Sequence, residues 1–235
     1  MKPSFDILIV GIGGQGTVLA SNVIGEACII ENRSVRSAET HGMAQRGGSV
    51  ESHVRIDGRY GSLIVPGTAD LLIAFDLLEA LRYRHYLSAS GRLIVNRHLV
   101  VPTPVYQQGM EAPDEESILN ALADLDLTCI DAAELAEEAG NILSQNIVML
   151  GAASAEIPLR PESLEEAVRR CVPPKTVDVN TTAFRLGRER GAGSSGVGGI
   201  PLRRSGSMMP GENARQHSLR NHASPAASSG WSSHT

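Results

Sequence analysis

The stretch Phe5–Thr17 constrains the fold of this chain more than any other, because it reads as a strand, a glycine turn and the start of a helix. Ile7–Val10 is a short apolar run rich in β-branched residues, which is typical of a strand buried on both faces. The run leads into a GxGxxG pattern at Gly11–Gly16, and apolar residues at helical spacing follow from Val18 to Ala27. Glycine suits this turn because it accepts positive φ and lets the backbone approach a ligand or a packed helix closely. The sequence therefore predicts a first βα unit.

The residues after this turn leave its ligand open. Free amides at the start of a helix favour an anion such as phosphate. A dinucleotide site normally adds an acidic residue about 20 positions further on to hold the ribose, but the second predicted strand has Arg36 there and no acid before Glu39. We therefore do not expect NAD; either the turn binds a phosphate, or its glycines only allow close packing of helix on strand. If it binds a cofactor, the contacts are expected at Gly11, Gly13, Gly14, Gln15, Gly16 and Thr17.

A second unusual stretch, Glu39–Gly48, follows a short strand predicted at Ser34–Ala38. It is neither amphipathic at helical spacing nor alternating, and its three glycines predict a loop. Open α/β sheets place ligands or partners at such loops. Arg46 is the best candidate for a contact, because a guanidinium binds carboxylates and phosphates bidentately, whereas a lone histidine in a polar loop is more often structural. The candidate ligand or interface residues are His41, Gln45, Arg46, Gly47 and Gly48.

The rest of the chain alternates predicted strands with predicted helices. Ser49–Ile56 alternates apolar and polar residues, and the Asp57-Gly58 pair predicts a hairpin turn with a return strand over 60–65. Further strands are expected at Leu71–Phe75, Gly91–Val95 and Leu127–Ile130. Helices are expected after Asp76, from Asp114 or Glu115 to Leu122, and at Ala132–Ala139, Asn146–Ala155, Pro161–Arg170 and Thr176–Arg190. This order predicts an α/β, Rossmann-like layered domain over residues 1–190, with a mostly parallel sheet flanked by helices.

Composition limits the classes of function. From Gly191 onward Gly, Ser, Pro, Asn and Arg dominate without periodicity, which predicts a disordered tail over 191–235. The net charge of -5 and the lack of a basic stripe argue against nucleic acid. No apolar run approaches the roughly 20 residues of a membrane span, and the start of the chain does not read as a signal peptide. Cys28, Cys129 and Cys171 form no CxxC pair, so we expect no metal in this chain and a reducing, cytoplasmic location.

Four stretches, taken in order, resemble the γ-type subunits of 2-oxoacid:ferredoxin oxidoreductases. These are Gly11–Gly16, His41–Val50, Asn146–Ala152 and the Asn180–Phe184 helix, and the resemblance covers residues 5 to about 190. Any one motif can arise by accident, whereas four in order are specific. Within the family, the indolepyruvate type is the most similar. The Gly/Ser-rich tail departs from the family pattern.

The resemblance implies a subunit that does not bind thiamine diphosphate and is inactive alone. A large partner subunit would hold thiamine diphosphate, Mg²⁺ and 4Fe–4S clusters, cleave the arylpyruvate and pass electrons to ferredoxin, while the acyl group ends on coenzyme A. The glycine turn then either receives a phosphate of coenzyme A or packs against the partner. Three alternatives stay open: a γ subunit serving pyruvate, 2-oxoglutarate or branched-chain 2-oxoacids, a free-standing nucleotide- or CoA-binding oxidoreductase, and a non-catalytic interaction module.

Overall fold

A six-stranded sheet forms the centre of the protein, in the strand order β2-β3-β1-β4-β5-β6. The computed structural model describes residues 4–41, 48–59, 61–101 and 111–194. β1 runs parallel to β4, β4 to β5 and β5 to β6, whereas β3 runs antiparallel to both of its neighbours, so the predicted mostly parallel sheet is confirmed. The strands are β1 (Phe5–Ile12), β2 (Val35–His41), β3 (Ser49–Ile56), β4 (Ala69–Ala74), β5 (Leu87–Asn96) and β6 (Asp126–Ile130).

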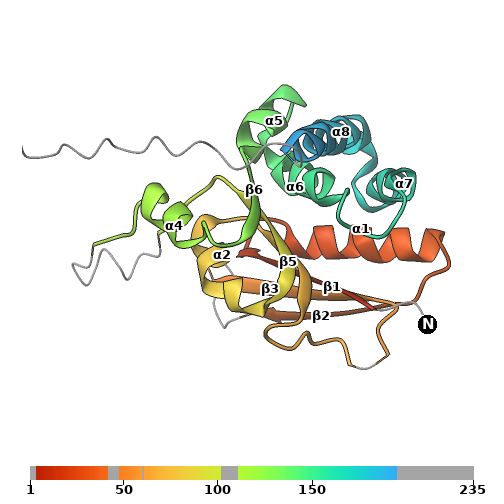
Figure 1. Cartoon of the computed structure of the whole chain (residues 1–235). Helices are drawn as coiled ribbons and strands as arrows, with labels where there is room; N and C mark the ends of the chain where they lie inside the picture. The colour runs from red at the N-terminus through yellow and green to blue at the C-terminus, as the bar shows by residue number, and fades with distance from the viewer. Residues whose placement is uncertain (1–3, 42–47, 60, 102–110, 195–235) are drawn as a thin grey trace, which may run out of the picture. The chain divides into compact units, whose positions relative to one another are not determined.

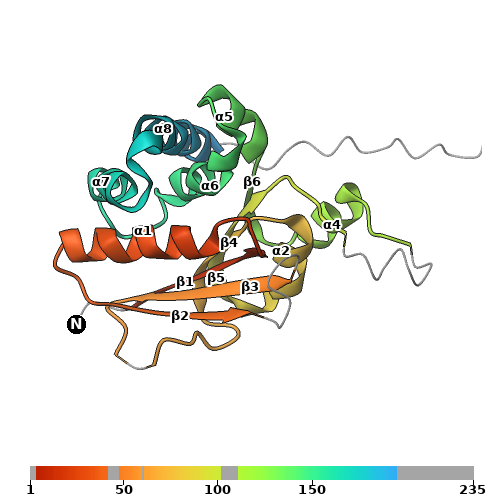
Figure 2. The same cartoon turned by 180° about the vertical axis from the view of Figure 1, so that it is seen from behind.

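Helices cover both faces of the sheet (Figures 1 and 2). On one face α1 lies against the sheet and contacts α7, while α5, α6 and α8 complete that layer; α2 and α4 cover the other face. The helices are α1 (Thr17–Ile30), α2 (Leu77–Tyr83), η1 (Arg84–Tyr86), α4 (Glu115–Ala121), α5 (Ala132–Glu138), η2 (Ile142–Ser144), α6 (Gln145–Ala153), α7 (Pro161–Cys171), η3 (Pro174–Thr176) and α8 (Val177–Ser194). Among the described residues, none of these helices is long and apolar enough to cross a membrane.

The strand β1 is buried on both faces, as its sequence predicts. Ile7 and Ile9 belong to the core beneath α1 and α6–α8, whereas Leu8 and Val10 belong to the core beneath α2 and α4. All four side chains have 0% exposed surface. Successive side chains of a strand point to opposite faces, so a continuous apolar run supplies both cores at once.

Aspartate N-caps start three of the predicted helices, α2, α4 and α5; at α4 the Asp114 carboxylate accepts a hydrogen bond from the Ser117 amide at 2.7 Å. The carboxylate of Asp76 accepts a hydrogen bond from the Leu78 amide at 2.9 Å, and that of Asp131 accepts one from the Glu134 amide at 3.2 Å. Each carboxylate thereby satisfies an amide that has no partner inside the first turn of its helix. Gly140, with φ of +100°, follows α5, in agreement with the predicted end of that helix.

The predicted hairpin after β3 is wrong. The described residues 61–65 form no strand, because β3 already pairs with β1 on one edge and with β2 on the other. The Asp57 carboxylate instead accepts hydrogen bonds from the Arg33 guanidinium at 2.7 Å and the Ser34 amide at 3.2 Å, which ties the end of β3 to the start of β2. The hairpin that does form joins β2 to β3, and β2 continues to His41, three residues into the stretch predicted as a loop.

Glycine backbones bring α6 and α8 into close contact, as the small residues of Asn146–Ala155 predict. A Cβ added at Gly187 would lie 2.0 Å from the Val148 carbonyl oxygen, and one at Gly151 would lie 2.1 Å from the Phe184 oxygen. Gly191 is buried in the same contact, and α8 runs to Ser194, four residues into the stretch predicted as tail. Residues 195–235, the rest of that predicted tail, lie outside the described residues.

Candidate functional site

A pocket of about 160 Å³ lies where the carboxyl ends of β1, β4 and β5 meet. Val10, Ala74 and Val95 stand side by side in register near these ends. After β1 the chain passes through α1 to β2, which lies on one side of β1 in the sheet. β4 lies on the other side of β1, so the strand order reverses between β1 and β4. Ligands of open α/β sheets bind outside the carboxyl ends of the strands at such a switch point.

The glycine turn after β1 forms one wall of this pocket. Gly14 and Gly16 have φ of +106° and +84°, values that favour glycine, and Gly16 is the N-cap of α1. A Cβ at Gly16 would lie 2.4 Å from Nδ2 of Asn146 in α6, and one at Gly11 would lie 2.7 Å from Oε1 of Gln15. The predicted need for glycine is therefore confirmed, both for positive φ and for close packing.

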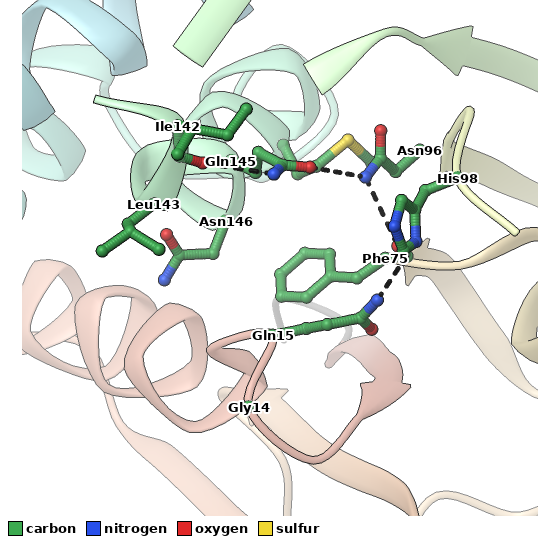
Figure 3. A pocket seen from close by; sticks show the side chains of 10 residues that line it. Gly14, Gln15, Phe75, Asn96, His98, Ile142, Leu143, Gln145 and Asn146 are labelled. Carbon is green, nitrogen blue, oxygen red and sulfur yellow. Dashed lines mark hydrogen bonds between the residues drawn. The ribbon is translucent and has the colours of Figure 1, made fainter. Parts of the chain in front are cut away.

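The side chain of Gln15 folds back over the turn. Its Oε1 accepts a hydrogen bond from the Ile12 amide at 2.6 Å, and its Nε2 lies 3.5 Å from Nδ1 of His98 (Figure 3). The Gly13 amide donates to the carbonyl of Gly48 at 2.8 Å. Within the described part of the chain, no acceptor is found for the amides of Gly14, Gly16, Thr17, Val18 and Leu19, whereas the Ala20 amide donates to the Gly16 carbonyl at 3.1 Å. Such free amides are able to bind an anion.

Thr17 was predicted as a polar contact, but it is 3% exposed beneath the turn. Its methyl carbon lies 3.0 Å from where a Cβ on Gly11 would stand. The Gly11–Gly16 turn itself borders the pocket through Gly14 and Gln15. Of the predicted cofactor contacts, Gly14 and Gln15 therefore line the pocket directly.

Carboxamide side chains from three segments line the pocket together (Figure 3). Asn96, at the end of β5, donates from Nδ2 toward the Phe75 carbonyl and toward Oε1 of Gln145, both at 3.4 Å, and its Oδ1 accepts from the Ala132 amide at 3.1 Å. Asn146 accepts the Ile147 amide at 3.0 Å. No Asp, Glu, Lys or Arg lines the pocket among the described residues. The lining carries both hydrogen-bond donors and acceptors.

A buried carboxylate holds a histidine at the pocket wall. Asp76 is 0% exposed; besides capping α2, its Oδ2 accepts the Val100 amide at 2.7 Å and lies 3.4 Å from Nδ1 of His98. The His98 side chain is 44% exposed and lines the pocket. Sequence reasoning missed Asn96 and His98, although both directly follow the strand predicted at Gly91–Val95. A strand's carboxyl end was the signal that would have found them.

The predicted loop residues are only partly described. His41 is the last residue of β2 and pairs with Val50, which pairs in turn with Gly11, so His41 lies two strands away from the glycine turn. Gln45, Arg46 and Gly47 lie outside the described residues. Gly48 borders the turn through its carbonyl, which accepts the Gly13 amide. The end of the second predicted stretch therefore meets the first.

The three cysteines carry free thiols in partly or fully buried settings. Cys28 is buried in α1, and burial raises the pKa of its thiol to about 11. Burial likewise raises the pKa of the half-buried Cys129 to about 11 and that of Cys171 above its ordinary value. Across the described ranges, no group of three or more His, Cys, Asp or Glu side chains is placed to hold a metal ion.

Two exposed apolar side chains line the pocket, and two more follow pocket-lining residues closely in the sequence. Ile142 and Leu143, in η2, line the pocket and are 40% and 82% exposed. Val18, in the first turn of α1, and Val100, bonded to Asp76, are 41% and 37% exposed. These are four of the seven large exposed hydrophobic residues in the described part of the chain. Exposed apolar residues such as Ile142 and Leu143 at a pocket indicate a surface that a ligand or another protein covers.

Comparison with known proteins finds matches of three kinds: a family model, similar sequences and a similar structure. A family model described as pyruvate ferredoxin/flavodoxin oxidoreductase matches residues 6–190. A Thermococcus kodakarensis protein named indolepyruvate oxidoreductase subunit IorB is 39% identical over 190 residues, which cover 78% of this chain and 94% of that protein. A Methanothermobacter marburgensis protein named 2-oxoglutarate synthase subunit KorC is 31% identical over 188 residues, with 78% and 95% covered. The crystal structure of a keto/oxoacid ferredoxin oxidoreductase gamma subunit from Geobacter sulfurreducens superposes with a TM-score of 0.61 at 26% identity, covering 81% of this chain and 99% of that one.

Proposed function

Because the chain belongs to the pyruvate ferredoxin/flavodoxin oxidoreductase family, we propose that it is the small subunit of an indolepyruvate ferredoxin oxidoreductase. The observation that carries this proposal is the 39% identity to a relative named as an indolepyruvate oxidoreductase subunit, over 94% of that relative's length. The relative named for 2-oxoglutarate is 31% identical, which favours an arylpyruvate substrate. The resemblance expected from the four sequence motifs is confirmed at the level of the family.

The reaction assigned to the complex is the oxidative decarboxylation of an arylpyruvate. The bond between the carboxylate and the keto carbon breaks, CO₂ leaves, and the acyl group joins the sulfur of coenzyme A as a thioester. Two electrons reduce two ferredoxins, and the thiol proton is released. Thiamine diphosphate with Mg²⁺, and 4Fe–4S clusters, supply the carbon chemistry and the electron transfer from the large partner subunit.

The residues of this chain are assigned to binding coenzyme A and the substrate and to contacting the large subunit. The exposed apolar side chains of Val18, Val100, Ile142 and Leu143 suit contact with the large subunit at the carboxyl edge of the sheet. The carboxamide-lined pocket suits the pantetheine arm of coenzyme A, which is neutral and carries two amide groups. The free amides of the glycine turn suit one of its phosphates. Arg46 is assigned to an anionic group of the substrate or of coenzyme A.

A variant of Gln145 tests the coenzyme A assignment. The large thiamine-dependent subunit is co-expressed with this chain under anoxic conditions, and the complex is purified through a tag on this chain. Gln145→Ala removes a carboxamide that lines the pocket, and one hydrogen bond is worth about 0.5–1.5 kcal/mol. We expect KM for coenzyme A to rise about 2- to 13-fold with kcat retained, as for the loss of uniform binding.

The matched control is Asn120→Ala, which removes an exposed carboxamide from α4, outside the pocket lining. It leaves KM for coenzyme A unchanged. If Gln145→Ala leaves KM unchanged as well but weakens co-purification, the pocket binds a segment of the partner instead. A tagged chain that purifies alone and colourless contradicts the subunit assignment itself.

A further inference from the structure

Four proton-bearing side chains form a continuous chain on the α2 face of the sheet. Ser49, the first residue of β3, has its Oγ 2.5 Å from Oε2 of Glu79 and 3.0 Å from the hydroxyl of Tyr83. The Tyr83 hydroxyl in turn donates to Oε1 of Glu51 at 2.8 Å. The order is therefore Glu79, Ser49, Tyr83, Glu51, with a carboxyl group at each end and two hydroxyls between them.

The four linked side chains have two hydroxyl protons but make three oxygen–oxygen contacts. Three contacts join the four groups, and each hydrogen bond needs one proton between its two oxygens. The hydroxyls of Ser49 and Tyr83 supply one proton each, and an ionised carboxylate supplies none. With each of the three contacts taken as a hydrogen bond, the third proton sits on Glu79 or on Glu51. With it, all three contacts are hydrogen bonds running in one direction, and they reverse when the proton changes ends.

Among the described residues, one guanidinium, that of Arg82, contacts Glu79, and one imidazole, that of His53, contacts Glu51. Glu79 is 3% exposed, and Arg82, itself 48% exposed, is 2.9 Å from its Oε1; the buried carboxylate of Asp76 stands at the start of the same helix. Nε2 of His53 lies 3.4 Å from Oε2 of Glu51. Since Nδ1 of His53 accepts the Ile64 amide at 3.2 Å, the proton of a neutral ring is on Nε2, which donates to Glu51.

Among the described residues, three aromatic side chains also lie beside these linked groups. The rings of Tyr86 and His85, in η1, lie 6.0 and 6.4 Å from the ring of Tyr83, and Tyr86 also meets His53 edge-on at 6.0 Å. Burial raises the pKa of Glu79 above its ordinary value and that of Tyr83 to about 12. Tyr83 therefore stays a phenol at neutral pH, and it passes its hydroxyl proton to one neighbour only as it accepts a proton from the other.

We propose that Glu79 and Glu51 share one proton through the hydroxyls of Ser49 and Tyr83, and that this relay stores and releases a proton beside the glycine turn. Glu51, whose side chain is 22% exposed, is the solvent end, and Glu79 is the interior end. Ser49 pairs with Ile12 at the end of β1, next to the Gly13–Gly48 hydrogen bond. The relay and the candidate pocket therefore lie at the same edge of the sheet, where β1 ends.

The catalytic use of the relay rests on the proposed function, whereas the shared proton does not. Thioester formation releases one proton from the thiol in each turnover, and a group that holds one exchangeable proton at this edge is suited to accept it. The shared proton is detected by spectroscopy of this protein without its partner, whereas the catalytic use of the proton is detected in the complex with the large subunit. The two proposals can therefore fail separately.

Isotope-edited infrared spectroscopy of the full chain, with its glutamates labelled with carbon-13, tests the shared proton. We expect the carbonyl band of one protonated glutamate to persist at pH 7, where an ordinary glutamate with a pKa of about 4.3 is ionised. Tyr83→Phe removes two contacts and one hydroxyl proton, which leaves one contact with one proton, so the band disappears. The matched control Tyr86→Phe keeps the band, since the Tyr86 hydroxyl has no hydrogen-bond partner among the described residues.

Two results overturn the shared proton: a wild-type spectrum without the band, or a Tyr83→Phe spectrum that retains it. If Tyr83→Phe does not fold, Glu79→Gln and Ser49→Ala decide, because each also removes the need for the third proton and abolishes the band. In the active complex, Tyr83→Phe is expected to shift the pH profile of kcat, and Tyr86→Phe is not. A Tyr83→Phe complex with the wild-type profile overturns the catalytic use, and an inactive wild-type complex overturns the proposed function while the infrared result stands.

Discussion

The contact between α6 and α8 predicts a large effect for one added methyl group, Gly187→Ala. The new Cβ would lie 2.0 Å from the carbonyl oxygen of Val148, 2.8 Å from its carbonyl carbon and 3.0 Å from its Cα. All three are backbone atoms, so no side-chain rotation relieves the clash, and the helices must separate by roughly 1 Å. Overpacking costs about 1–3 kcal/mol, and a backbone clash belongs at the upper end. Alanine returns about 1 kcal/mol through its better helix propensity, which leaves a net loss of about 2 kcal/mol.

Urea unfolding of the full chain measures this loss. With a typical slope of about 2 kcal/mol per molar urea, a loss of about 2 kcal/mol lowers the midpoint by about 1 M. The matched control is Gly25→Ala in α1, where nothing lies within 4 Å of the added Cβ. We expect that variant to gain about 0.5–1 kcal/mol, so the same substitution has opposite signs in the two helices. A Gly187→Ala chain as stable as wild type would refute the close helix contact.

Three further predictions concern single side chains. Arg46→Ala is expected to leave the circular dichroism spectrum and the urea midpoint unchanged while lowering the activity of the complex, and full activity removes Arg46 from the site. Burial lowers the pKa of His53 in the fold below its ordinary value of 6.5, so the unfolded chain binds more protons between the two values and the free energy of unfolding falls as pH drops below about 6.5. His53→Gln should flatten this part of the urea-midpoint profile, and an unchanged slope contradicts the assignment. The Cys28 thiol, with a pKa of about 11, is about one part in a thousand thiolate at pH 8; peptide mapping after iodoacetamide should find it unmodified until urea unfolds the chain, and labelling at the rate of a free thiol contradicts its burial.

Elements whose signals are local could be predicted from the sequence. The first βα unit was predicted because the apolar run, the glycines and the helical spacing lie within consecutive residues. The helix starts at Asp76 and Asp131 were predicted because a cap needs only its own carboxylate and an amide two or three residues later. The three glycines of Glu39–Gly48 indicated a turn, but the pairing of His41 with Val50 extends the strand into that stretch.

Features that depend on distant segments could not be predicted in this way. The return strand over 60–65 fails because both edges of β3 are taken, and the sequence around Asp57 does not reveal that β1 takes one of them. The pocket joins Gln15, Asn96, His98 and Gln145, which only the sheet order brings together. The small residues of α6 indicated a close partner, but nothing in them identifies α8 as that partner.

The most direct test of the subunit assignment is anoxic reduction of ferredoxin with indolepyruvate and coenzyme A. Three samples are compared: this chain, the large thiamine-dependent subunit, and the two combined at equal concentration. Our account predicts a brown complex whose ferredoxin reduction requires both chains and both substrates, with indolepyruvate preferred over pyruvate and 2-oxoglutarate. Full activity from the large subunit alone, or none when the two chains are combined, would contradict it.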